Sequence, residues 1–188
     1  MQLNLPQKTR MRLVAVLPLV FFIAQVIHYW KISQLGNLAW MCNIGNLMLA
    51  VGLFFDKPLL VRVAGIWMIP GLFIWLRYVV FAWGVFFSST LAHLGGLTVG
   101  MWGVRKVRMD DKSWLYAFGW YFLLQLFSRF FTAPDLNVNL AHRIQDGLET
   151  TFKTYWFFWL GLTLVTGVVL WILGKLLARL FPVKVGPL

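Results

Sequence analysis

Charged residues are scarce in this chain, and acidic residues are the scarcest of them. Only 12% of the 188 residues are charged, with six Asp and Glu against 17 Lys and Arg, whereas 60% are hydrophobic and 18% aromatic. A soluble globular domain carries roughly twice this share of charged residues. The composition therefore excludes an ordinary soluble domain and indicates a membrane protein.

Cysteine is represented by a single residue, Cys42, which excludes an internal disulfide and any metal site built from several cysteines. Histidine is also rare, and the chain holds three: His28, His93 and His142. The first apolar run lacks a small-residue cleavage site at its end, so we expect it to be retained as an anchor and not removed as a signal peptide.

Six apolar runs have lengths suited to crossing a bilayer as helices, which takes about 20 residues. We predict these spans at residues 13–30, 35–55, 59–76, 88–104, 113–131 and 154–177. The apolar stretch at residues 77–87 is too short to cross, and we expect an interfacial or re-entrant segment there. The predicted fold class is all-α: a polytopic membrane protein with six transmembrane helices in one bundle.

The basic residues gather on one side of this arrangement. With six crossings, 12 Lys and Arg lie on the side of the two termini and five on the other side. The positive-inside rule then places both termini in the cytoplasm, in a multi-pass protein of the plasma (inner) membrane. We expect a basic cytoplasmic arm at residues 1–12, a six-helix domain at 13–177 and a basic cytoplasmic tail at 178–188. The basic residues then meet lipid headgroups, and no nucleic-acid partner is expected.

A polar sector interrupts the first half of the run at residues 35–55. Cys42, Asn43 and Asn46 share one sector of a helix at this spacing. Amide side chains are costly in lipid, so we expect this sector to face other parts of the protein.

A second polar group opens the run at residues 88–104. Ser89, His93, Gly96, Gly100 and Gly103 follow one helical stripe, and two of the glycines form a G-x-x-x-G pair. This pair lets a neighbouring backbone approach, which places His93 at the top of a protein-facing groove. A packed histidine, bonded to Ser89 or to a neighbouring carbonyl, is the simplest interpretation of this pattern.

The six-span topology places the thiol and one imidazole at similar depth, in the outer half of the bundle. A histidine within reach can hold a thiol as thiolate and later return the proton to a leaving group, which is sufficient for acyl transfer. The candidate catalytic residues are Cys42 and His93. The candidate substrate-binding residues are Asn43, Asn46, Arg77, Ser89 and His142. The alternatives are a merely buried cysteine, an arginine that anchors at the membrane surface and a histidine in a solvated loop.

Two other classes of function are open. Histidines on different spans can ligate haem, for which His28 and His93 are the two at comparable depth, and His28, His93 and His142 together could hold a metal ion. No tight ligand motif is present, so we expect no cofactor and no metal. The aromatic content and the glycine stripe also suit a non-catalytic subunit or scaffold of a larger membrane complex, with partner membrane subunits.

Four short motifs in these runs resemble a known family. They are W40-x-C42-N43-x-x-N46-L47, W67-x-x-P70-G71, S89-T90-x-x-H93 and N137-x-N139. Their order over residues 35–173 is similar to that in YwaF-like small bacterial integral membrane proteins. That family is itself similar to a transmembrane ether-phospholipid acyltransferase and to the androgen-induced membrane hydrolases.

The resemblance implies a six-helix core with a cysteine or threonine nucleophile and a histidine base, which would be Cys42 and His93 in this sequence. The chain departs from the family pattern at Asn43, where an acidic residue is common. It also has Trp40 and Met41 where a histidine often precedes the cysteine. The function that we expect is an integral membrane acyltransferase or lipid hydrolase whose Cys/His pair opens to the outer leaflet and acts on membrane lipids.

Overall fold

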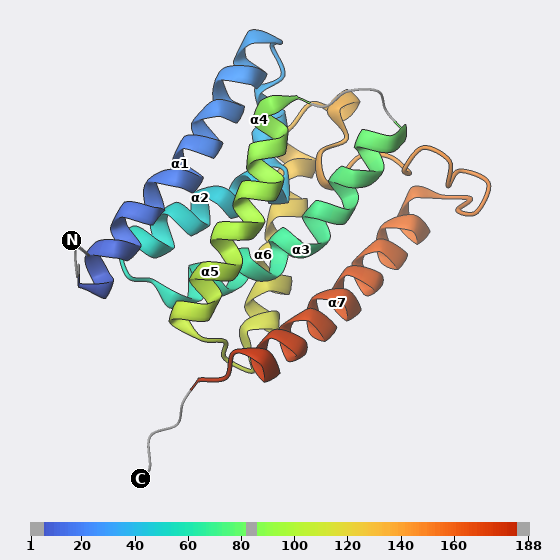
Figure 1. Cartoon of the computed structure of the whole chain (residues 1–188). Helices are drawn as coiled ribbons and strands as arrows, with labels where there is room; N and C mark the ends of the chain where they lie inside the picture. The colour runs from blue at the N-terminus through green and yellow to red at the C-terminus, as the bar shows by residue number, and fades with distance from the viewer. Residues whose placement is uncertain (1–5, 82–85, 184–188) are drawn as a thin grey trace.

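The computed structural model describes residues 6–81 and 86–183, and the regular elements in these ranges are helices, apart from one isolated β-bridge. Consecutive long helices run in opposite directions, so the chain passes back and forth through one bundle (Figure 1). The single long helices are α1 (Gln7–Lys31), α2 (Met41–Phe54), α3 (Pro58–Phe81), α6 (Ser113–Phe131) and α7 (Tyr155–Leu180). A composite helix between α3 and α6 consists of α4 (Phe87–Thr90), a π-helical turn η2 (Leu91–Gly95) and α5 (Gly96–Val107).

Three of the helices, α1, α3 and α7, are long and apolar enough to cross a membrane. Large apolar side chains are exposed along all three, as expected for helices whose outer faces meet lipid. The all-α fold class is confirmed for the described residues, and the structure supports a transmembrane protein. Two helices extend past the predicted spans: α1 begins within the arm predicted at residues 1–12, and α7 ends within the tail predicted at residues 178–188.

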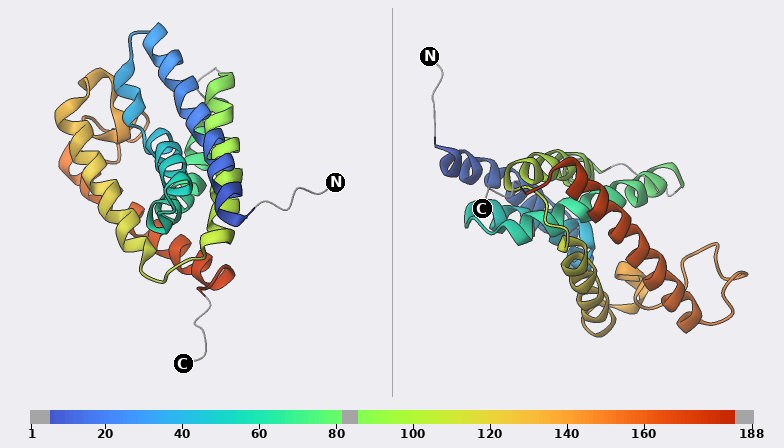
Figure 2. Two further views of the ribbon diagram at one scale, coloured as in Figure 1. Left: turned by 90° about the vertical axis from the view of Figure 1, so that its left-hand side faces the viewer. Right: turned by 90° about the horizontal axis from the view of Figure 1, so that it is seen from below.

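The core lies where α2, α3 and α5 pack together beside α1 (Figure 2). Leu49 of α2 and Trp67 of α3 are completely buried there. Gly65 lets α3 and α5 approach closely, because an added Cβ atom there would overlap a side-chain methyl carbon of Val104 in α5. The indole N–H of Trp67 donates to the carbonyl of Ala117 over 3.1 Å, which joins α6 to this core.

The apolar run at residues 35–55 is divided, and the prediction of one unbroken helix was wrong. A 3-10 helix, η1 (Leu35–Ala39), precedes α2, and Trp40 between them has a ψ angle of 138°. The indole N–H of Trp40 donates to Oδ1 of Asn37 over 3.1 Å. A short amide side chain that bonds locally in this way favours a turn over a continuing helix.

The segment at residues 77–87 also differs from its predicted form. Residues 77–81 are the last part of α3 and Phe87 begins α4, whereas residues 82–85 lie outside the described ranges. α3 passes Arg77 without a break, because a long cationic side chain near a helix end can extend to the membrane surface. A separate interfacial segment that begins at Arg77 was therefore a wrong prediction.

The two ends of the bundle are built differently. At one end, the α5–α6 loop is tied to the end of α7 by a 2.7 Å hydrogen bond from the N–H of Met109 to the carbonyl of Phe181, and by a β-bridge to Pro182. At the other end, the α6–α7 loop contains the 3-10 helices η3 (Pro134–Leu136) and η4 (Val138–Leu140). We call these the basic end and the loop end.

Candidate functional site

Cys42 is the second residue of α2, and its thiol is free and partly buried. The first N–H groups of a helix have no partner inside the helix and carry a partial positive charge, which stabilises an anion. At this helix start the N–H of Met41 donates to Asn139 and the N–H of Asn43 donates to the carbonyl of Trp40, so within the described residues the N–H of Cys42 is the one next to the thiol that has no acceptor. Tyr29 of α1 lies beside Cys42 and Asn43.

The start of α2 is held by Asn139, which lies in η4 of the distant α6–α7 loop. Its Oδ1 accepts from the N–H of Met41 over 3.1 Å, and its Nδ2 donates to the carbonyl of Ala39 over 2.7 Å. Nδ2 also donates to Oγ of Ser128 over 2.9 Å. Asn139 thus fills the role of an N-cap from another segment of the chain, and it fixes the backbone one residue before Cys42.

One turn after Cys42, the buried amide of Asn46 joins α2 to η2. Its Nδ2 donates to the carbonyl of Cys42 and to the carbonyl of Ala92, both over 2.9 Å. Because Ala92 directly precedes His93, this side chain holds the thiol-bearing turn against the imidazole-bearing turn. Oδ1 of Asn46 lies over Gly96, where an added Cβ atom would come within 2.7 Å of it. The amide of Asn46 therefore faces protein, as the sequence predicts.

His93 is buried in the π-helical turn η2. Its Nδ1 lies 2.8 Å from the carbonyl oxygen of Ser89, and because a carbonyl only accepts, Nδ1 carries the proton. In the neutral imidazole Nε2 then holds the lone pair, and the described residues provide it with no hydrogen-bond partner. The bond to Ser89 agrees with a packed histidine, and it also leaves Nε2 able to accept a proton. Single π-helical turns within α-helices are frequent at functional sites.

Cys42 and His93 pack against adjacent turns of α3. A Cβ atom on Gly71 would lie 3.7 Å from the Cβ atom of Cys42. Trp75, four residues later, stacks on the ring of His93 with 5.3 Å between the ring centroids and 15° between the planes. The described residues contain no hydrogen bond between the thiol and the imidazole. The structure thus brings the two turns to one junction of α2, α3 and η2, and it leaves the pair itself unbonded.

Asn43 and the glycine stripe also belong to this junction. Nδ2 of Asn43 donates to the carbonyl of Asn37 over 2.9 Å, and its buried Oδ1 has no partner among the described residues. Added Cβ atoms at Gly96, Gly100 and Gly103 would all meet atoms of α2 or α3 within 4 Å. The predicted protein-facing groove below His93 is therefore confirmed.

The other candidate residues have different surroundings. Arg77 is exposed on the last turns of α3. Ser89 contacts His93 through its backbone carbonyl and not through its hydroxyl. The ring of His142 bonds to the carbonyl of Ser128 over 3.1 Å, so it is tied to α6. Within the described residues no hydrogen bond joins Arg77 to the junction of α2, α3 and η2, and His142 reaches it only indirectly, through Ser128, whose hydroxyl accepts from Asn139.

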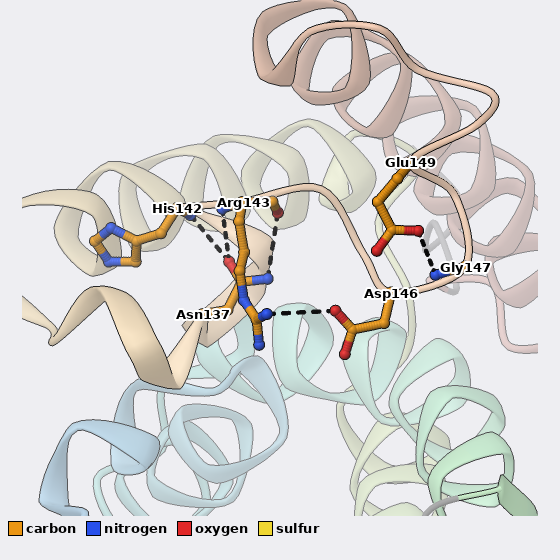
Figure 3. A network of polar contacts seen from close by, with 6 residues as sticks. All are labelled: Asn137, His142, Arg143, Asp146, Gly147 and Glu149. Carbon is orange, nitrogen blue, oxygen red and sulfur yellow. Dashed lines mark hydrogen bonds and ion pairs between the residues drawn. The ribbon is translucent and has the colours of Figure 1, made fainter.

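His142 belongs to a polar network in the α6–α7 loop that surrounds Asn137 (Figure 3). Oδ1 of Asn137 accepts from the N–H groups of His142 and Arg143, each over 3.0 Å, and its Nδ2 donates to the carbonyl of Arg143 over 3.2 Å. Arg143 also pairs with Asp146 over 3.4 Å. This network shapes the loop that presents Asn139 to the start of α2.

Two residues of the junction, Trp75 and Asn139, were absent from the residues predicted for the site. The motif N137-x-N139 was visible in the sequence, and asparagine is one of the few residues that readily adopts a left-handed backbone, as both do here. That signal marks a special turn, but it does not name the helix that the turn will cap. Trp75 has no distinguishing signal among the 11 tryptophans of the chain.

The three histidines lie in separate environments. The ring of His28 packs on Phe86 with 4.6 Å between centroids, whereas His93 stacks on Trp75 and His142 bonds to α6. Over residues 6–81 and 86–183, no group of three or more His, Cys, Asp or Glu side chains is placed to hold a metal ion. The geometry therefore gives no support to the haem and metal hypotheses.

Two cavities lie at the basic end. One, of about 780 Å³, is between the α5–α6 loop and the end of α7, and the other, of about 300 Å³, is between the start of α1 and the end of α2. Neither Cys42 nor His93 lines them. No family model, no curated protein and no solved structure matches the chain. The YwaF-like resemblance stays a prediction, and a function has to be inferred from the junction itself.

Proposed function

We propose that this chain is a multi-pass protein of the plasma (inner) membrane with six crossings. α1, α3 and α7 supply three of them. The others are η1 with α2, the composite helix α4–η2–α5, and α6, and consecutive crossings run in opposite directions (Figure 1). Under this topology 12 of the 17 Lys and Arg residues lie on the side of the basic end, which supports a cytoplasmic location for that end and for both termini.

We propose further that the junction of α2, α3 and η2 catalyses acyl transfer from a membrane lipid, with Cys42 as nucleophile and His93 as general base. The observation that carries this proposal is the double hydrogen bond of Asn46 to the carbonyls of Cys42 and Ala92. It holds a thiol at a helix amino terminus and an imidazole with a free Nε2 on neighbouring turns. Asn46 is then a positioning residue, because both of its N–H groups are already used.

In the first step Nε2 of His93 takes the thiol proton, and the sulfur of Cys42 attacks the carbonyl carbon of a lipid ester. Negative charge on the carbonyl oxygen develops near the N–H of Cys42 and the second amide N–H of Asn43, which can donate to it, whereas the N–H groups of Met41 and Asn43 already donate to Asn139 and Trp40. The ester C–O bond breaks, the leaving hydroxyl takes the proton from His93, and a thioester remains on Cys42.

In the second step the thioester is resolved. An acceptor hydroxyl, or water, attacks the thioester carbon while His93 takes its proton. The C–S bond breaks and the proton passes to the sulfur, which restores the thiol. Transfer to a hydroxyl makes the protein an acyltransferase, and transfer to water makes it a lipid hydrolase.

The proposal can be tested with an alkyne-tagged fatty acyl ester as a probe. Because Cys42 is the only cysteine, any label that hydroxylamine removes as a thioester reports this residue alone. We expect labelling of the unaltered protein, none of Cys42→Ala, and a rate at least about 100-fold lower for His93→Gln. His28→Gln is the matched control, since His28 packs on Phe86 and should label normally. Equal rates for the two histidine variants, or labelling of Cys42→Ala as strong as that of the unaltered protein, would contradict the proposal.

One observation favours a second function, that of a non-catalytic subunit in a larger membrane complex. In the most apolar 18-residue stretch of α7, 17% of the residues are buried inside the protein. The same share is 22% in α1 and 39% in α3. Trp156 and Phe157 are among its exposed aromatic side chains, which suit packing against a partner helix. Purification in a mild detergent distinguishes the two functions. A stoichiometric partner that is lost from Trp156→Ala supports the subunit, and a monodisperse monomer contradicts it.

A further inference from the structure

The larger cavity at the basic end has a balanced set of charges on its wall. Two acidic and two basic side chains line it: Asp110, Asp111, Lys175 and Arg179. Nζ of Lys175 lies 2.5 Å from the carboxylate of Asp111, so these two charges neutralise each other.

The other two charges of this wall are not paired with each other or with the first pair. Arg179 is exposed, and within the described residues its guanidinium has no ion pair or hydrogen bond. Asp110 accepts one hydrogen bond, from the N–H of Lys112 to Oδ1 over 2.8 Å, which leaves its second carboxylate oxygen uncommitted. One cation and one anion of the wall are thus available to a ligand.

An apolar track leads from the membrane interior to these charges. Ile172, Leu176 and Arg179 follow one another at spacings of four and three residues, so they lie on one face of α7. The two apolar side chains are about half exposed and also line the cavity. A phospholipid has the same order along its length, with acyl chains first and a phosphate beyond them.

We infer that this cavity binds the headgroup of phosphatidylethanolamine. The guanidinium of Arg179 binds two phosphate oxygens through its N–H groups. The ammonium group donates to the uncommitted oxygen of Asp110, and an acyl chain lies along Ile172 and Leu176. The two available charges sum to zero, which complements a zwitterion. A purely anionic headgroup leaves Asp110 facing a like charge, and a choline headgroup has no N–H to donate.

The inference is tested on the full-length protein, purified in detergent and freed of lipid, by native mass spectrometry with added lipids. The lipids are phosphatidylethanolamine, phosphatidylcholine and phosphatidylglycerol with the same acyl chains. We expect the first to bind about tenfold more tightly than the other two, the effect of one charge-assisted hydrogen bond. Arg179→Gln should lose about tenfold in affinity for phosphatidylethanolamine, and Asp110→Asn should lose the preference over phosphatidylcholine.

Two matched variants at the basic end serve as controls. Lys106→Gln removes a cation that lies over the ring of Trp102, outside the cavity, and Asp56→Asn removes a carboxylate that pairs with Lys8. Both should keep the affinity for phosphatidylethanolamine within about twofold. Arg179→Lys keeps the charge but not the paired N–H groups, so it should bind with intermediate affinity.

The inference fails if the three lipids bind with equal affinity, because the protein would then contact lipid without a specific binding site. It also fails if phosphatidylglycerol binds most tightly, or if Arg179→Gln and Lys106→Gln behave alike. None of these outcomes depends on Cys42 or His93, so this experiment tests the lipid site independently of the proposed catalysis.

Discussion

The amide of Asn46 is the side chain on which the arrangement of the candidate site depends. Both of its N–H groups donate to carbonyls, one within α2 and one in η2, and the residue is completely buried. The hydrogen bond to Ala92 is buried and the one to Cys42 is partly buried. Loss of the buried bond therefore cannot be offset by bonds to solvent.

Replacement of this residue tests the role directly. We expect Asn46→Ala to lower the free energy of unfolding by about 1–2 kcal/mol, because one buried and one partly buried hydrogen bond are lost. It should also slow thioester labelling of Cys42, because the turn that carries His93 is no longer held. Thermal unfolding in detergent and labelling rates measure the two effects.

Thr98→Val is the matched control for this substitution. Its hydroxyl donates only to the carbonyl of Leu94 in the same helix, over 2.8 Å, and the residue is exposed. Its effect should stay within about 0.5 kcal/mol. If Asn46→Ala behaves like this control in both measurements, Asn46 does not position the site.

At the residue scale, the sequence predicts the side-chain contacts that follow from residue spacing or from the cost of burying a polar group. The amide of Asn46 had to face protein because lipid offers it no partner, and the bond between His93 and Ser89 follows from their separation of four residues. The partners that lie far away in the chain were not predictable. Asn139 caps α2 over a separation of 98 residues, and Trp75 stacks on His93 from another helix.

At the scale of elements, the composite helix α4–η2–α5 packs closely because its glycines face α2 and α3. The sequence treats Gly96 and Gly100 as equivalent members of one G-x-x-x-G pair. The structure distinguishes them, because a Cβ atom on Gly96 would meet Oδ1 of Asn46 at 2.7 Å, whereas on Gly100 its nearest contact is an ordinary 3.5 Å.

This difference predicts that the same substitution to alanine destabilises the protein more at Gly96 than at Gly100. Gly96→Ala should cost about 1–3 kcal/mol of stability and reduce labelling of Cys42, because it displaces the amide of Asn46. Gly100→Ala should change stability by less than about 1 kcal/mol. Unfolding of the two variants in one detergent provides the comparison. A larger loss for Gly100→Ala would show that the contact between α3 and α5, and not the amide of Asn46, limits the packing.

The elements also show why helix positions were more predictable than helix breaks. Apolar runs long enough to cross a bilayer led to all the long helices, because length and hydrophobicity alone determine them. The break at Trp40 is stabilised by the local bond to Asn37 and by the cap from Asn139, and the second of these comes from the distant α6–α7 loop, which the spacing of residues does not indicate. The π-helical turn around His93 has no known sequence pattern, and it changes the direction in which that imidazole points.

At the scale of the whole molecule, the proposed six-crossing topology places the basic end and the loop end on opposite sides of the membrane. Glu149 is exposed in the α6–α7 loop and Lys112 is exposed in the α5–α6 loop. In a Cys42→Ala background, Glu149→Cys should react with a membrane-impermeant maleimide in intact cells. Lys112→Cys should react only after the membrane is opened. The reverse pattern, or reaction of both from outside, would contradict six crossings with cytoplasmic termini.

The central claim, that Cys42 forms an acyl thioester with the help of His93, is tested most directly by the mass of the intact protein. The purified chain is incubated with a phospholipid that carries one defined acyl chain and is then measured without digestion. We predict a mass increase of one acyl group that disappears with hydroxylamine, is absent from Cys42→Ala and accumulates far more slowly in His93→Gln. An unchanged mass throughout the reaction, together with normal folding of the protein, would contradict the account.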